Sequence, residues 1–388
     1  MITLETANNA LKSFYLDAVT DMLNKKANPF LAKLEGSTNN VVGKEVKKLV
    51  RVGMNGGIGA GTETGGLPVA GGSDYRQLTL PLKNLYGTIE ISDKAIRASA
   101  NSEGAFVNLL NDEMQSLVQS AKYNFGRMLF GDGTGKISVV AGKVDGKIQM
   151  QSVTNLFEGM IVDVANESGT IVDELRGCKI VAMDRQNKQV TLEKAGADLS
   201  VINTKYSFFV NGSKGEEITG LSALFSDKEL YGQSRENSFM RPYIKKQVGD
   251  IDEMNIQTAI DTIEECSGGK VNFIICSNGV RRALLQYYKS QNIMLPTTEI
   301  EGGFTALTFN GIPVVADRFC PFGTMYLLNT DDFKVHQLCD WQWMEGEDGK
   351  ILRQIPGKPV YTATLVKYAE LMCERPCGQG MLSGITEV

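Results

Sequence analysis

One stretch of the chain, from Glu103 to Phe130, constrains the fold more than any other. Its apolar residues recur at steps of three and four, which is the spacing of one face of an α-helix. At 1.5 Å per residue such a helix is roughly 40 Å long, and its single apolar stripe needs a sheet or other helices beside it. We therefore predict an elongated subunit with this helix as its spine. The apolar positions are Phe106, Leu110, Met114, Leu117, Ala121, Phe125 and Met128.

The spine helix has clear start and stop signals. Asn101 or Ser102 can cap its start by accepting a backbone N–H, and residues 131–135, Gly-Asp-Gly-Thr-Gly, stop it. Together with Lys136 this loop resembles a phosphate loop. However, Ile137 stands where a magnesium-binding Ser or Thr is needed, and a helix rather than a strand precedes it. We interpret the loop as a helix terminator.

A second constraint is glycine, which fills nine of the twenty positions from 53 to 72. Strand-like segments at 44–52 and 77–91 flank it, so the pattern predicts a long hairpin with a glycine-rich tip. Such an arm cannot hold a core of its own. We expect it to bury little within its own subunit, to be mobile in an isolated monomer, and to be stable only against something else. Its glycine spacing does not match a dinucleotide fingerprint, and no helix follows.

The remaining segments have distinct patterns. Residues 6–34 predict a helix broken at Asn28-Pro29. Residues 137–211 contain five or six short alternating runs separated by turn signals, which predicts a small β-barrel or sandwich inserted between helical regions. From Gly249 onward the pattern is mixed α/β, and residues 359–374 predict a long terminal strand.

The α/β part has local signals of its own. Asp250 followed by Glu253 is a capping-box-like helix start, and Ser277 or Asn278 can cap the next helix. Asn310-Gly311 between two apolar runs predicts a tight β-hairpin.

Composition excludes several classes of protein. The chain has 388 residues, a net charge of −5, 42% hydrophobic and 22% charged residues, which is ordinary for a folded protein and gives no basic nucleic-acid surface. No run of about 18 apolar residues could span a membrane, and no signal-peptide pattern opens the chain. The seven cysteines are odd in number and scattered, as in a cytoplasm-made protein with reduced thiols.

The sequence gives little support for a catalytic site or a metal site. The chain has one histidine, His336, which lies in a strand-like run and which we interpret as structural. Cys373 and Cys377 lack further ligands nearby in sequence, although Cys320, Cys339 and His336 could join them through folding. We find no nucleophile elbow and predict no catalytic, cofactor or metal site.

Three stretches, in this order, resemble the major capsid proteins of tailed bacteriophages. They are Leu-Tyr-Gly-Thr-Ile-Glu-Ile-Ser at 85–92, the spine helix with its Gly-Asp-Gly-Thr-Gly exit at 103–135, and Ala-Leu-Thr-Phe-Asn-Gly-Ile-Pro-Val-Val at 306–315. That fold is shared with encapsulin shells and the herpesvirus capsid floor. The resemblance covers nearly the whole chain except the β-rich insertion and implies an α+β fold.

The resemblance also implies named parts of the fold. The peripheral domain would hold the spine helix 103–130, and the axial domain would converge at five-fold and six-fold centres. The implied parts are an N-terminal arm at 1–43, an extended loop at 44–84, a peripheral domain at 85–136 and 335–388, an inserted β-rich domain at 137–219, and an axial α/β domain at 221–334.

The implied function is self-assembly into hexamers and pentamers of an icosahedral shell enclosing double-stranded DNA, without sequence reading. Implied partners are other copies of the chain, a portal protein and a scaffolding protein; no membrane is involved. The scaffold is expected to be a separate protein, because the sequence begins directly at the arm, unless the sequence is already the processed form. The location would be the virion capsid, assembled in the bacterial host cytoplasm. An encapsulin-like shell is the alternative, and an enzyme with a Gly-rich lid is a more distant one.

Contacts between subunits would fall on the extended loop. No lysine lies between Arg51 and Lys83, so the tip cannot form the Lys–Asn isopeptide bond of some relatives. Non-covalent burial and ion pairs must then hold neighbours together, because an acidic–basic pair across an interface fixes register. The candidate contact residues are Arg51, Asn55, Glu63, Asp74 and Arg76.

Overall fold

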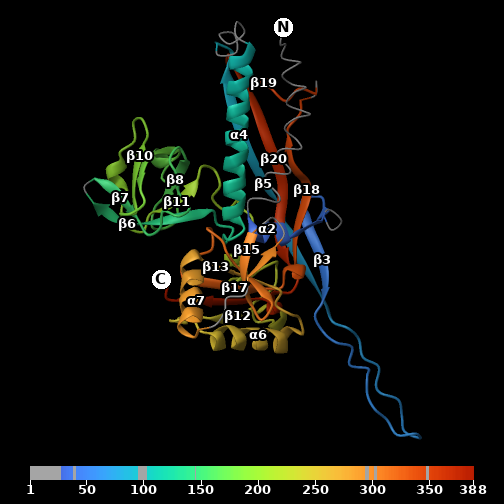
Figure 1. Cartoon of the computed structure of the whole chain (residues 1–388). Coiled ribbons are helices and arrows are strands. Elements are labelled where there is room, and N and C mark those ends of the chain that lie inside the picture. The colour runs from blue at the N-terminus through green and yellow to red at the C-terminus, as the bar shows by residue number, and fades with distance from the viewer. Residues whose placement is uncertain are drawn as a thin grey trace.

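The chain is elongated, with a barrel on one side and a long loop projecting from the other (Figure 1). A long helix and long strands form one end of the body, and a sheet covered by two helices forms the opposite end. The computed structural model describes residues 28–37, 41–94, 103–144, 146–292, 297–300, 304–346 and 349–388.

The spine helix is α4, Glu103–Met128, which ends slightly before the expected Phe130. It lies along a five-stranded sheet in which β20 pairs with both β5 and β18. Met114, Ala121, Phe125 and Met128 of the predicted face are buried, whereas the side chains of Phe106 and Leu110 fall outside the described part. The strands of this sheet are β1 (Glu35–Ser37), β5 (Lys83–Ser92), β18 (Phe333–Trp343), β19 (Arg353–Gln354) and β20 (Val360–Cys373).

The inserted region is a closed barrel of six strands in the order β10-β7-β6-β11-β8-β9. It has a core of its own, in which Leu156 and Phe208 are fully buried. The prediction of a small β-barrel is therefore confirmed. The strands are β6 (Lys136–Val144), β7 (Lys147–Met150), β8 (Ile161–Ala165), β9 (Cys178–Asp184), β10 (Gln189–Glu193) and β11 (Ser207–Val210).

The opposite end of the body is a seven-stranded sheet in the order β12-β21-β17-β13-β16-β15-β14. Helices α6, Glu253–Ser267, and α7, Asn278–Ser290, share one hydrophobic core with this sheet. Asn310 and Gly311 turn between β15 and β16 with φ of 48° and 83°, as the hairpin signal predicts. The strands are β12 (Tyr243–Lys245), β13 (Phe273–Cys276), β14 (Thr297–Ile300), β15 (Phe304–Phe309), β16 (Ile312–Ala316), β17 (Thr324–Leu328) and β21 (Gly380–Ser383).

Two local expectations are corrected here. The N-cap of α6 is Asp252, whose carboxylate accepts the N–H of Asn255 at 2.6 Å, rather than Asp250. The last strand, β21, pairs with β17 and β12. Residues 380–383 therefore belong to the sheet of the expected axial domain and not with the rest of 335–388, because the chain returns after β20 and inserts β21 between the edge strand β12 and β17. The cap on α7 is Ser277, as expected.

Part of the predicted N-terminal helix can be assessed. A short helix, α2, Pro29–Lys33, starts after Asn28, whose side chain accepts the N–H of Phe30 at 2.9 Å. Phe30 is fully buried, with ring centroids 6.1 Å from Phe130 and 5.6 Å from Phe333. The rest of that prediction, residues 6–27, lies outside the described residues.

Candidate assembly surface

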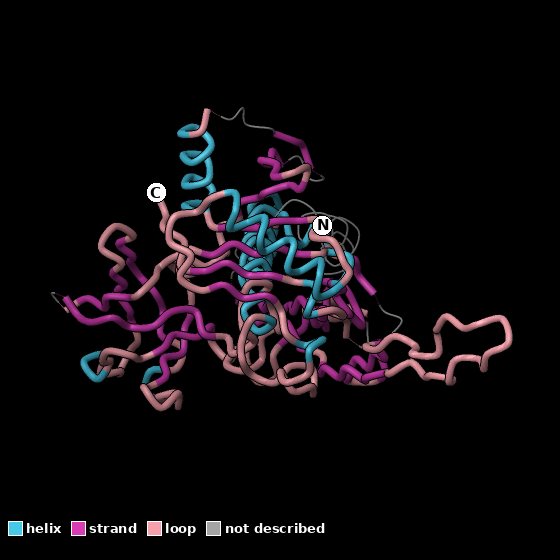
Figure 2. Tube along the Cα trace, turned by 90° about the horizontal axis from the view of Figure 1, so that it is seen from below, coloured by secondary structure: helices cyan, strands magenta, loops and turns pink. Residues whose placement is uncertain are grey.

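The most exposed part of the molecule is the loop at 53–74, which has neither helix nor strand and extends far from the body (Figures 1 and 2). Large apolar side chains point into solvent along it. Met54 is 94% exposed, Ile58 88%, Leu67 93% and Val69 88%. Apolar side chains gathered on a projecting segment mark an interaction site, so this loop is the candidate assembly surface.

The two limbs of the loop run close together, and glycine makes this possible. A Cβ on Gly71 would lie 2.6 Å from the backbone nitrogen of Gly57, and a Cβ on Gly57 would lie 2.8 Å from that of Gly71. No side chain fits in either place without moving the backbone. The N–H of Val52 donates to the Asp74 carbonyl at 2.9 Å where the limbs meet the strands.

The strands that carry the loop are packed on their own subunit. β3, Glu45–Arg51, pairs with β2, Val41–Val42, and with β4, Tyr75–Pro81. Val46 and Leu78 are fully buried, and the Thr79 N–H donates to the Tyr231 carbonyl at 3.1 Å. The expectation that this whole hairpin buries little at home is therefore wrong. Only residues 53–74 are left without a core.

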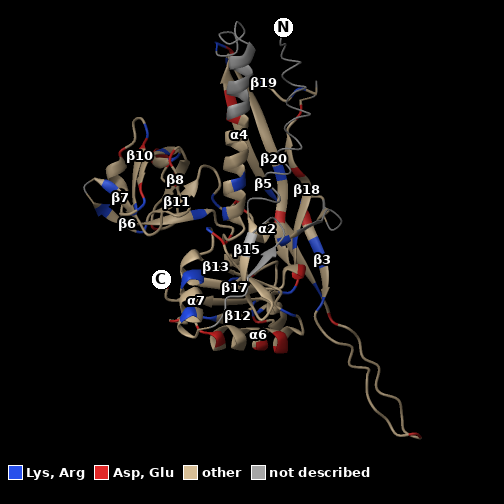
Figure 3. Ribbon diagram, in the orientation of Figure 1, with Lys and Arg blue, Asp and Glu red and all other residues tan. Residues whose placement is uncertain are grey.

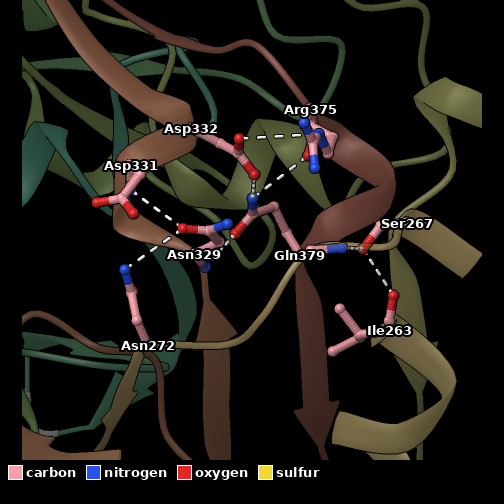
Figure 4. Close-up of polar contacts among 9 residues, drawn as sticks. Ile263, Ser267, Asn272, Asn329, Asp331, Asp332, Arg375 and Gln379 are labelled. Atoms are coloured by element: carbon pink, nitrogen blue, oxygen red, sulfur yellow. Dashed lines mark hydrogen bonds and ion pairs between the residues drawn. The ribbon is translucent and has the colours of Figure 1, made fainter. Parts of the chain in front are cut away.

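Charged and polar groups gather where β3, at the base of the loop, meets the segment between β20 and β21. Lys48 pairs with Glu374 at 3.2 Å, and Arg375 lies 3.8 Å from Asp332. Gln379 Nε2 donates to Asp332 at 3.1 Å (Figure 4). Burial raises the pKa of Asp332 to about 6. The Lys48–Glu374 pair therefore links β3, which carries the loop, to the chain just after β20, and the other contacts order that segment.

A groove of about 800 Å³ opens beside this anchor. Leu49 and Arg51 of β3 form one wall, and Phe239, Cys266 and Cys377 lie on the others. Leu49 is 63% exposed. The groove thus continues the apolar, partly basic surface from the loop onto the body.

The predicted contact residues fall on this loop and its strands, all of them exposed. Asp74 and Arg76 pair with each other at 3.2 Å instead of being left for a neighbour. Asn55 accepts the N–H of Gly57 at 2.9 Å and so supports a turn. Sequence reasoning missed the exposed apolar side chains, although their position among the glycines could have revealed them.

The barrel is attached to the body in a different way. Arg127 at the end of α4 forms two hydrogen bonds with Glu217, at 2.9 and 2.5 Å, and the two side chains are only 4% and 3% exposed. Lys83 adds a bond to the Gly215 carbonyl at 2.6 Å. Because a buried, bidentate ion pair has strict geometry, it fixes the segment that leaves the barrel after β11 against the end of the spine helix.

No arrangement suited to catalysis or metal binding stands out in the described part of the chain. No three His, Cys, Asp or Glu residues there come together as metal ligands. His336 is fully buried beneath the hairpin, and burial lowers its pKa. Cys373 is buried, and burial raises its pKa far above the ordinary value. None of the described helices is both long and apolar enough to cross a membrane.

Comparison with known proteins identifies the fold. Neither a protein-family model nor a curated protein sequence matches the chain. Its structure is similar to a chain of the cyanophage A-1(L) capsid asymmetric unit, with a TM-score of 0.55 and 12% identity over 95% of this chain and 93% of that one. A chain of Mycobacterium phage Bobi aligns over 100% of both chains with a TM-score of 0.47 and 10% identity. The SrpI encapsulin of Synechococcus elongatus aligns over 95% of both with a TM-score of 0.47 and 9% identity.

The chain therefore has the α+β fold of a bacteriophage capsid protein, as its sequence predicts.

Proposed function

We propose that this chain is the major capsid protein of a tailed bacteriophage and assembles into the hexamers and pentamers of an icosahedral shell. The observation that carries the proposal is the loop at 53–74. It extends from a body with a capsid fold and leaves Met54, Ile58, Leu67 and Val69 in solvent. Fully burying side chains of this size contributes about 1.5–3 kcal/mol each, and only another subunit can bury them.

The loop can adapt to neighbouring subunits that are placed at slightly different angles. Identical subunits in five-fold and six-fold rings see slightly different surroundings. Glycines allow the limbs to bend, while the packed strands β3 and β4 keep the loop's origin fixed. Arg51 and Glu63, both exposed, are the proposed charged contacts with a neighbour, and Asn55 the polar one. Asp74 and Arg76 would act as a preformed pair.

The same proposal assigns each part of the chain to a domain of the shell subunit. Residues 85–136, with β18 and β20, form the peripheral domain, and residues 221–334, with β21, form the axial domain. The barrel at 137–219 stabilises the subunit or touches neighbours. The shell would take a portal protein and a separate scaffolding protein as partners and enclose double-stranded DNA without reading its sequence, after assembly in the host cytoplasm.

Electron microscopy of the purified protein, expressed alone and together with candidate scaffolding proteins, tests the proposal. We expect rings of five or six subunits or closed shells. A lone monomer at high concentration under every condition would contradict it. An encapsulin-like shell would instead form closed particles that protect protein cargo, so nuclease-resistant DNA in particles from infected cells decides between the two.

A further inference from the structure

The two helices on the outer face of the seven-stranded sheet carry opposite charge. Helix α6 has four acidic residues and no basic one, and α7 has three basic residues and no acidic one. Figure 3 shows acidic residues along α6 and basic residues on α7, at different borders of this end of the molecule. The acidic residues are Glu253, Asp261, Glu264 and Glu265, and the basic residues are Arg281, Arg282 and Lys289.

Several of these charges oppose the dipole of their own helix. Glu264 and Glu265 lie in the last turn of α6, which has no basic residue. Arg281 and Arg282 lie near the start of α7, whose first turn has no acidic residue of its own, although the Glu387 carboxylate lies at that helix start. Negative charge at a helix C-terminus and positive charge near an N-terminus are both unfavourable. Residues that are locally unfavourable in the single chain often serve a function, such as contact with a partner.

No side-chain ion pair joins the α6 acids or the α7 cations to another residue in the described part of the chain, although Arg282 contacts a main-chain oxygen of Val388. Asp261 accepts a hydrogen bond from Gln257 at 2.6 Å. Beside the acidic carboxylates, Met254 is 70% exposed. The outer face of α6 therefore combines unpaired charge with an apolar side chain open to solvent.

The acidic end of α6 points away from α7. Glu253, at the start of α6, is close enough to Tyr288 of α7 to raise the pKa of that phenol, behind the larger effect of burial. The C-terminal turn of α6 lies on the same face of the sheet but away from α7. It borders the groove that includes Cys266 and Ser267. Lys270 and Arg375 are the cations near this end of α6. At the start of α7, Glu387 accepts a hydrogen bond from Ser277.

We propose that the acidic C-terminal half of α6 in one copy contacts the basic outer face of α7 in the next copy. This inference rests on the proposed assembly function. It identifies the surfaces through which neighbouring subunits of one ring would touch. An acidic border and a basic border on one subunit produce a head-to-tail contact, and such contacts close into rings. A contact between the acidic faces of α6 in two copies, or between the basic faces of α7, would place like charge against like charge and is disfavoured by several kcal/mol.

Charge exchange between the two helices tests the contact. Glu264→Lys with Glu265→Lys, or Arg282→Glu with Lys289→Glu, should each weaken ring formation by about tenfold or more, because like charges then meet. Combining all four substitutions should restore it. The exposed barrel residues Glu174 and Glu193, both changed to Lys, are the matched control and should leave assembly unchanged.

Mass photometry measures the rings, and circular dichroism confirms that each variant folds. If the wild type forms rings and either charge reversal leaves them intact, or the four-fold exchange fails to restore them, the inference is wrong while the assembly function stands. If the wild type forms no oligomer, the proposed function itself fails.

A cross-link gives a second test that does not depend on weakened assembly. Cys266 is exposed in the last turn of α6, and Gln286→Cys places a thiol on the exposed face of α7. Diamide takes two electrons and two protons from each thiol pair to form the disulfide and becomes the hydrazine. A head-to-tail ring predicts a ladder from dimer to closed ring. Dimers alone, or no product beyond the Cys266→Ser control, would overturn the inference.

Discussion

The loop at 53–74 and the barrel at 136–210 both extend from the body, yet they reach stability by opposite routes. The barrel buries Leu156 and Phe208 completely in a core of its own, whereas the loop leaves Met54 and Leu67 more than nine-tenths exposed. Closing the barrel also removes the free strand edges that a hairpin leaves. The comparison teaches that the barrel buries its apolar side chains within its own subunit, whereas the apolar side chains of the loop need a neighbouring subunit to bury them.

The largest effect should come from removing the loop. Replacing residues 54–72 with a two-residue Asn-Gly turn keeps the β3–β4 pairing, because Val52 and Asp74 already meet there. We expect folding to be preserved and shell formation to be lost, as judged by circular dichroism and electron microscopy. Shells formed by the shortened chain would show that the loop is not the assembly surface.

A large effect on stability should come from the ion pair that holds the barrel. Arg127→Met leaves Glu217 buried and uncompensated, which we expect to lower the free energy of unfolding by about 3–5 kcal/mol in urea titrations. The double variant Arg127→Met with Glu217→Leu removes both charges and is the control. It should recover most of the loss; equal destabilisation of the two variants would contradict this account.

A paired leucine substitution compares the two extensions directly. Leu156→Ala empties space in the barrel core and should cost about 2–5 kcal/mol of stability. Leu67→Ala in the loop should change folding stability by less than about 0.5 kcal/mol while weakening assembly. Thermal unfolding and mass photometry measure the two effects. A loop variant that unfolds as easily as the barrel variant would mean that the loop packs on its own subunit.

The last effect depends on pH and concerns the buried carboxyl group of Glu370. It accepts the N–H of Thr219 at 2.6 Å and of Leu371 at 3.0 Å, and burial raises its pKa to about 8. A raised pKa means that its contribution to stability is fully present below the ordinary value of about 4.3 and is lost as the pH rises through 8.

Glu370→Gln should therefore remove part of the fall in stability between pH 5 and pH 8. Urea unfolding at several pH values measures it, and the slope from this one group cannot exceed about 1.4 kcal/mol per pH unit. Identical pH profiles for variant and wild type would show that Glu370 is ionised in the folded chain.

Much of the fold could be predicted because the pattern is local. The spine helix follows from the three- and four-residue spacing of Met114, Ala121 and Phe125, and the barrel from short alternating runs between turns. The turn at Asn310-Gly311 needed only two residues of sequence.

The burial of the hairpin base could not be predicted, because its cause is distant in sequence. Val46 lies in the segment 44–52, where charged and apolar residues share both faces, so the pattern gives no sign that it or Leu78 is buried. Their cover comes from Tyr231 and from β20, far along the chain. In the candidate site, the exposed loop was predicted from its glycines. The pairing of Asp74 with Arg76 was missed, although residues two apart in an extended segment share one face and their spacing could have indicated it.

Hydrogen–deuterium exchange of residues 53–74, compared between the unassembled subunit and the assembled shell, tests the central claim most directly. The account predicts fast exchange in the free subunit and strong protection in the shell, while the Leu156 region of the barrel stays protected in both. Equal exchange of the loop in the two states would show that neighbours do not complete it, and would contradict the account.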